Sequence, residues 1–163
     1  MDKFTGRVWV LGDDIDTDII IPTEYLALKT IYDMKQYGFS PLRPELAGQI
    51  QKGDIIVAGK NFGCGSSREQ APEIIKAMGV QCVIAKSFAR IFFRNSINNG
   101  LLLIEQPDLY DDMKEGDEIT VVMNEHVDYN GKEYSIASLP ENLMSIIQAG
   151  GLVKAMRKLN GLD

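Results

Sequence analysis

The chain has 163 residues, of which 45% are hydrophobic and 25% charged, a composition that suits one globular domain with its own core. Its 17 basic and 23 acidic residues give a formal net charge of −6, and no basic stripe stands out, which argues against non-specific nucleic-acid binding. The apolar runs are far shorter than the ~20 residues of a membrane span, and Met1–Phe4 lacks the apolar core of a signal peptide, so a cytoplasmic location is expected.

The first predicted strand is Arg7–Leu11. It is followed by an acidic segment and then by an irregular stretch, Thr23–Leu46, which contains one glycine and two prolines. This stretch is predicted to be a long loop with a helical turn near Ile31–Tyr37. Long structured loops are uncommon in compact domains and are often functional.

From Asp54 the pattern becomes regular. The strand Ile55–Ala58, a glycine-rich loop, a helix over about Arg68–Met78 and the strand Cys82–Ala85 form a predicted βαβ unit. A second helix, about Phe88–Asn98, precedes the strand Leu101–Ile104. Continuous apolar strands that alternate with helices are typical of a parallel sheet covered by helices.

Beyond residue 105 the pattern favours antiparallel strands. Glu118–Met123 and Lys132–Ile136 are predicted to pair across the tight-turn dipeptide Asn130-Gly131. The chain after Pro140 has helical spacing, with a break at Gly150-Gly151. The sequence therefore predicts a single α/β domain over residues 1–163, with additional antiparallel strands.

The loop Asn61–Glu69, N-F-G-C-G-S-S-R-E, carries the densest chemistry in the chain. A loop between a strand and a helix presents backbone N–H groups and the positive end of the helix dipole to a bound anion. Ser66 and Glu69 have the spacing of a capping box. Because Pro72 would interrupt the helix, a short first turn, a kink and spare N–H donors are expected.

The alternative interpretation of this loop is a capped helix start without chemistry, since serines at such positions are usually caps. The loop lacks the pattern of a P-loop, of a dinucleotide fingerprint and of a G-x-S-x-G elbow. Cys64 has no nearby histidine to activate it and is interpreted as a small loop residue. The loop therefore favours a carboxylate or phosphate ligand, which its asparagine, serines and arginine would bind.

Other charged groups are weaker candidates. Asp13, Asp14, Asp16 and Asp18 lack the spacing of a calcium loop and are expected to be solvated, with Asp18 the best candidate for a site. Arg90 and Arg94 share one helix with four-residue spacing and fit surface positions.

Metal ligands are scarce in this chain. It holds two cysteines, Cys64 and Cys82, and one histidine, His126. A zinc site or an iron–sulfur cluster needs more soft ligands at suitable spacing, so no metal site is expected here. If a metal takes part in the chemistry, most of its ligands must come from another chain.

Three motifs in order carry a family resemblance: G-D-D-I-D-T-D-I-I-I-P (Gly12–Pro22), A-G-K-N-F-G-C-G-S-S-R-E (Ala58–Glu69) and A-K-S-F-A-R-I-F-F-R-N-S-I-N-N-G (Ala85–Gly100). Together they resemble the small subunits of isopropylmalate isomerase, or isopropylmalate dehydratase, in the aconitase superfamily. The resemblance is detailed from Arg7 to Ile104. It implies the swivelling β/β/α fold of the mobile aconitase domain.

The resemblance also implies a larger partner subunit that carries a 4Fe–4S cluster on three cysteines, and a dehydration and rehydration of a hydroxy-diacid. Ser66 matches the serine that, as an alkoxide, removes a proton beside a substrate carboxylate. Ser67 and Arg68 match residues that hold a carboxylate, and Asp18 matches a polar active-site position. The partner's iron would act as a Lewis acid on the departing hydroxyl.

Substrate choice is expected to depend on Tyr25, Leu26, Ala27 and Leu28, which match the family's specificity segment. Their apolar side chains suit an isopropyl group, because a third carboxylate buried there would be costly. Lys29 could still reach such a carboxylate. Isopropylmalate in leucine biosynthesis is therefore the leading hypothesis, homoaconitate and dimethylmaleate are the alternatives, and a non-catalytic anion-binding regulatory module is a distant one.

Overall fold

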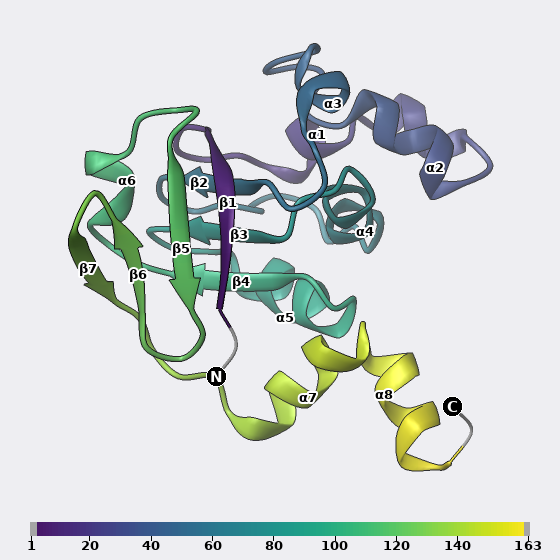
Figure 1. The fold of residues 1–163 in the computed structure, drawn as a ribbon. Helices are drawn as coiled ribbons and strands as arrows, with labels where there is room; N and C mark the ends of the chain where they lie inside the picture. The colour runs from purple at the N-terminus through teal and green to yellow at the C-terminus, as the bar shows by residue number, and fades with distance from the viewer. Residues whose placement is uncertain (1–2, 162–163) are drawn as a thin grey trace.

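The computed structural model describes residues 3–161, which form a seven-stranded sheet with helices (Figure 1). The strands are β1 (Lys3–Val10), β2 (Ile55–Ala58), β3 (Cys82–Ala85), β4 (Leu102–Glu105), β5 (Glu118–Val122), β6 (His126–Tyr129) and β7 (Lys132–Ser135). The helices are α1 (Thr17–Ile20), α2 (Ile31–Met34), α3 (Leu46–Gln49), α4 (Gln70–Ala77), α5 (Arg90–Asn98), α6 (Leu109–Asp112), α7 (Glu141–Ala149) and α8 (Leu152–Leu159), with 3₁₀ turns η1 (Thr23–Ala27) and η2 (Lys35–Tyr37).

The strand order is β4-β3-β2-β1-β5-β6-β7. Strands β4 to β1 are parallel, as predicted, and β5 to β7 continue the sheet in antiparallel pairs. The long strand β1 joins the two parts, because Val8–Val10 pair with β2 whereas Lys3–Arg7 pair with β5.

Strand β6 was not predicted from the sequence. The dipeptide Asn130-Gly131 joins β6 to β7, and β6 itself lies between the two strands that were predicted to pair directly. The turn before β6 contains Asn124 at φ 65° and no glycine, so it lacks the usual sequence mark of a tight turn. The prediction of antiparallel strands here is correct, but the pairing was wrong.

The parallel strands separate two apolar cores, which explains why every residue of β2 and β3 is buried. Helices α4 and α5 and the N-terminal helices cover one face, which contains Trp9, Ile56, Ala58, Val83 and Leu103. The antiparallel strands cover the other face, which contains Val8, Ile55, Val57, Cys82 and Ile84. Figure 1 shows these layers, with α4 and β5 on opposite sides of the parallel strands. This is the β/β/α arrangement that the resemblance implied.

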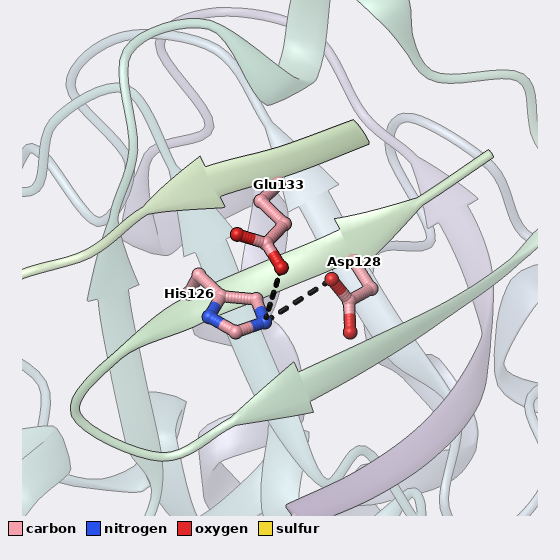
Figure 2. Close-up of side chains that lie close together, drawn as sticks. All are labelled: His126, Asp128 and Glu133. Atoms are coloured by element: carbon pink, nitrogen blue, oxygen red, sulfur yellow. Dashed lines mark ion pairs between the residues drawn. The ribbon is translucent and has the colours of Figure 1, made fainter. Parts of the chain in front are cut away.

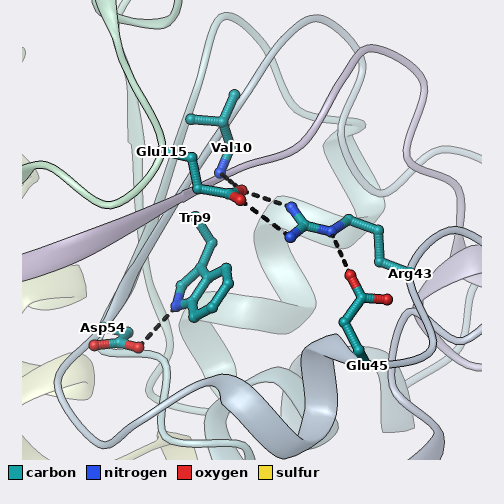
Figure 3. Close-up of polar contacts among 6 residues, drawn as sticks. All are labelled: Trp9, Val10, Arg43, Glu45, Asp54 and Glu115. Atoms are coloured by element: carbon teal, nitrogen blue, oxygen red, sulfur yellow. Dashed lines mark hydrogen bonds and ion pairs between the residues drawn. The ribbon is translucent and has the colours of Figure 1, made fainter.

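In the stretch Thr23–Leu46, α2 and η2 form the helical turn predicted near Ile31–Tyr37. The stretch is more helical than predicted, since it also contains η1 and the start of α3. It is held down by Phe39, which is fully buried, and by Arg43. The Arg43 guanidinium donates to both carboxylate oxygens of Glu115 at 2.5 and 3.0 Å, and Glu115 also accepts the Val10 N–H at 3.0 Å (Figure 3). Beside it, Trp9 Nε1 donates to Asp54 at 2.7 Å.

The C-terminal residues form α7 and α8 on either side of Gly150-Gly151, as predicted. Lys76 Nζ of α4 donates to the carbonyl oxygens of Asn99 at 3.0 Å and Gly150 at 3.1 Å, so it ties these helices to α4 and the end of α5. None of the helices within residues 3–161 has the length and apolar character to cross a membrane.

Candidate functional site

The three sequence motifs converge beyond the carboxyl ends of β1, β2 and β3. Gly63 N–H donates to Ile15 O at 2.7 Å, which joins the loop after β2 to the segment after β1. On the other side, Phe62 N–H donates to Ser87 O and Ala89 N–H donates to Phe62 O, both at 3.0 Å. In open sheets the carboxyl ends of parallel strands are where ligands bind, so this junction is the candidate site.

The loop owes its path to a phenylalanine and a glycine. Phe62 is fully buried, and its ring meets Phe88 and Phe92 edge to face with centroids 5.9 and 5.5 Å away. Gly63 follows at φ 84°, and a Cβ there would lie 2.1 Å from Cγ of Phe92. Only glycine fits, because the backbone is both left-handed and pressed against the Phe92 ring.

Asp13 and Asp14 are exposed, as expected for solvated carboxylates, and they also bond to the start of the loop. Asp13 Oδ1 accepts the Lys60 N–H at 2.7 Å, and Asp14 Oδ1 accepts from Asn61 Nδ2 at 3.2 Å. Asp14 N–H in turn donates to Lys60 O at 2.8 Å. These acidic groups therefore anchor the start of the loop.

Thr17 holds the middle of the loop, a role that the sequence analysis missed. Its N–H donates to Cys64 O, and its Oγ1 donates to Ser66 O, both at 2.9 Å. Thr17 itself is buried, being 2% exposed. Thr17 therefore hydrogen-bonds to the loop backbone on both sides of Gly65, which fixes the position of Ser66.

Ser66 and Ser67 are exposed at the edge of a cavity of about 230 Å³. Within residues 3–161, neither hydroxyl has a hydrogen-bond partner, so both are available to a ligand. The side chains and backbone that line the cavity include Thr17, Ser66, Ser67, Arg68, Arg90 and Asn95.

The helix after the loop begins later than predicted. Helix α4 starts at Gln70 with Glu69 at its N-cap, and Glu69 makes no side-chain capping bond. The predicted capping box of Ser66 and Glu69 was therefore wrong. The predicted kink was also wrong, because Pro72 falls in the first turn, where its missing N–H would have no partner inside the helix.

Arg68 and Asp18, both predicted site residues, form an ion pair. Arg68 Nη1 lies 2.5 Å from Asp18 Oδ1 and also donates to Ile21 O at 3.0 Å. Arg68 Nη2 donates to Thr23 Oγ1 at 2.9 Å. The Arg68 side chain is 14% exposed and that of Asp18 is 64% exposed. The guanidinium is thus fixed by Asp18, Ile21 and Thr23 before any ligand binds.

The predicted specificity residues follow Thr23, which bonds to Arg68, and none of them lines the cavity. Tyr25 stacks on Tyr37 with ring centroids 4.0 Å apart. Tyr25, Leu26 and Leu28 are half-buried against the core, whereas Ala27 and Lys29 are exposed. Of the four predicted positions, Ala27 is the most exposed.

The cysteines do not form a metal site of their own. Cys82 is fully buried in the sheet, and Cys64 is the one thiol in the loop. Burial raises the pKa of the Cys64 thiol, and Asp16 and Asp14 raise it further. A cluster that needs at least three thiolates does not fit the residues of this chain.

His126 lies on the antiparallel side of the sheet, where its Nε2 is 3.1 Å from Asp128 Oδ1 and 3.6 Å from Glu133 Oε2 (Figure 2). Asp128 and Glu133 are paired residues of β6 and β7, so these contacts link the two strands on their exposed face. Strands β1 and β5 separate β6 from β2 in the sheet, which keeps this cluster apart from the loop.

Known proteins match over nearly the whole chain. The model of the aconitase C-terminal domain matches residues 22–109. The 3-isopropylmalate dehydratase small subunit of Lachnospira eligens is 78% identical over 162 residues, 99% of each chain. Small subunit 1 of 3-isopropylmalate dehydratase from Archaeoglobus fulgidus is 50% identical over 157 residues, 94% of this chain and 97% of the relative. A crystal structure of 3-isopropylmalate dehydratase from Methanocaldococcus jannaschii has a TM-score of 0.92 at 39% identity and covers 99% of this chain and 97% of that one. The expected fold is confirmed.

Proposed function

The chain belongs to the family of 3-isopropylmalate dehydratase small subunits, and on that premise we propose that it supplies one half of a shared active site. The reaction removes water from isopropylmalate and adds it back with the hydroxyl on the neighbouring carbon, a step of leucine biosynthesis. The observation that carries this proposal is the meeting of Ser66, Ser67 and Arg68 in one cavity of about 230 Å³.

Ser66 is the base of the proposed reaction. Its oxygen, as an alkoxide, takes the proton from the carbon beside a carboxylate while the hydroxyl leaves the adjacent carbon and a C=C bond forms. A serine hydroxyl is weakly acidic, so the alkoxide needs fixed positive charge and oriented donors nearby. The Arg68 guanidinium lines the same cavity, and the Thr17 bond to Ser66 O holds the loop in place.

Ser67 and Arg68 hold a substrate carboxylate in this proposal. Arg68 is suited to the role because its planar guanidinium matches a carboxylate, and because Asp18 and Thr23 already fix its orientation. Asp18 thereby acts as a positioning residue for the guanidinium. An aligned guanidinium loses less entropy when the substrate binds.

A large subunit completes the site. The relatives are named small subunits, and Ser66 and Ser67 are exposed, so a second protein surface is needed to exclude water. The 4Fe–4S cluster that the resemblance assigns to the large subunit supplies a Lewis acid for the departing hydroxyl.

The substrate is proposed to be isopropylmalate because Ala27, the exposed residue of the specificity segment, is small and apolar. Homoaconitate and dimethylmaleate are the alternatives within the same chemistry. An apolar pocket separates substrates that differ by a methyl group by only ~1–3 kcal/mol, so a substrate panel must rank them.

The test is reconstitution with the cognate large subunit under anaerobic conditions, with alkene formation from isopropylmalate as the readout. Ser66→Ala should lower the rate by roughly 10²–10⁴-fold, the usual contribution of a general base. Ser145→Ala, an exposed serine of α7, is the matched control and should retain the rate. Wild-type activity in Ser66→Ala would refute the assignment of Ser66 as the base. If the isolated chain bound phosphate and did not associate with the large subunit, the non-catalytic anion-binding module would be favoured instead.

A further inference from the structure

Arg90 is the second arginine of the cavity that contains Ser66. It is the first residue of α5, after the N-cap Ala89. The start of this helix is fixed to the loop, because Ala89 N–H donates to Phe62 O at 3.0 Å. Two residues further on, Phe92 is 3% exposed and packs against the Phe62 ring. The backbone of Arg90 is therefore held rigidly beside the loop.

The two arginines differ in how many of their donors are in use. Arg68 is committed to Asp18, Ile21 O and Thr23. Arg90 is exposed, and in the part of the chain that the structure describes it has no ion-pair or hydrogen-bond partner. It is thus the cation of the cavity whose donors remain free for a ligand.

The side chain of Arg90 could instead pair with an acidic residue of a second cavity. Arg90 also borders a largely apolar cavity of about 410 Å³, in which Glu105 is the acidic lining residue. No Arg90–Glu105 ion pair forms among residues 3–161. Arg90 therefore lines both cavities, and no ion pair among the described residues holds its guanidinium away from Ser66.

The proposed substrate carries two negative charges, so a second cationic side chain is expected in the site. A hydroxy-diacid carries two carboxylates, and Arg68 accounts for one of them. The N-terminal end of a helix adds favourable potential for the other, and a guanidinium pairs with a carboxylate through two parallel bonds. We propose that Arg90 is a substrate-binding residue that pairs with the second carboxylate of the hydroxy-diacid, an inference that rests on the proposed function.

The test compares Arg90→Ala and Arg90→Lys with Arg94→Ala in the complex reconstituted with the large subunit. Arg94 is an exposed residue one turn along the same helix and does not line the cavity, so it controls for surface charge. Arg90→Ala should raise KM for isopropylmalate by roughly 10–100-fold, the loss expected for a charge-assisted hydrogen bond. Arg90→Lys should recover part of that loss, and Arg94→Ala should stay within about twofold because exposed charges contribute little.

A half-ester of isopropylmalate, used as a competitive inhibitor, separates substrate binding from a structural role. If Arg90 binds the second carboxylate, wild type should prefer the diacid over the ester blocked at that carboxylate, and Arg90→Ala should lose the preference. An unchanged KM, or a preserved preference, would overturn the proposal. So would loss of large-subunit association in Arg90→Ala, measured by sedimentation, since Arg90 would then be an interface residue. A wild-type complex without activity would instead overturn the proposed function, and the role of Arg90 with it.

Discussion

Gly63→Ala should be far more damaging than a glycine substitution usually is. The backbone at Gly63 has φ 84°, and a Cβ there would lie 2.1, 2.4 and 2.6 Å from Cγ, Cδ2 and Cβ of Phe92. The left-handed conformation costs an L-residue ~1–2 kcal/mol. The clash adds ~1–3 kcal/mol, since overpacking against a buried ring cannot relax cheaply. The total expected destabilisation is therefore ~2–5 kcal/mol.

Gly116→Ala is the matched control, because Gly116 has φ 94° and nothing lies within 4 Å of its added Cβ. Its free energy of unfolding should fall only by the cost of the left-handed conformation, ~1–2 kcal/mol. Urea unfolding of both variants and wild type measures the difference directly. If Gly63→Ala were no less stable than Gly116→Ala, Phe92 would not confine the loop, and the explanation of its path would be wrong.

Three further predictions concern separate parts of the molecule. Ala27→Arg should shift the preference of the reconstituted enzyme toward a tricarboxylate such as homoaconitate, and an unchanged ranking in a substrate panel would contradict the role of this segment. Burial and the 2.6 Å bond to Asp112 raise the pKa of Tyr134 to about 12. Tyr134→Phe should therefore remove the tyrosine ionisation that occurs at the highest pH in an ultraviolet absorbance titration. The hydrogen bond from Arg43 lowers the pKa of Glu115. The ionised carboxylate therefore stabilises the fold above its unfolded-state pKa, and this stabilisation is lost as the pH falls through the lower folded-state pKa. The gap in urea midpoint between wild type and Glu115→Gln should accordingly narrow in acid, and a constant gap would refute the coupling.

The parallel strands were predictable because burial on both faces leaves a continuous apolar run, as in Ile55–Ala58 and Cys82–Ala85, whose bounds the structure confirms. Of the short helices in Thr23–Leu46, the turn near Ile31–Tyr37 was predicted, whereas η1 and the start of α3 were not, because segments of three to five residues carry no helical period. They form through tertiary anchors such as Phe39, and no local pattern identifies such anchors.

The setting of the candidate site was also predictable, since the glycine-rich loop lies between a strand and a helix as expected. Its internal contacts were not. Thr17 bonds Ser66 O across 49 positions of sequence, and Arg90 lines the cavity because α5 packs against Phe62. The capping-box spacing of Ser66 and Glu69 misled because the loop, held by Thr17, stays irregular as far as Glu69.

The central claim is that Ser66 moves a proton to and from substrate carbon. The most direct measurement is exchange of the substrate C–H proton with solvent deuterium, followed by NMR in the reconstituted complex. Wild type should incorporate deuterium, whereas Ser66→Ala should be slower by roughly 10²–10⁴-fold with isopropylmalate still bound. Exchange at the wild-type rate in Ser66→Ala would contradict the claim.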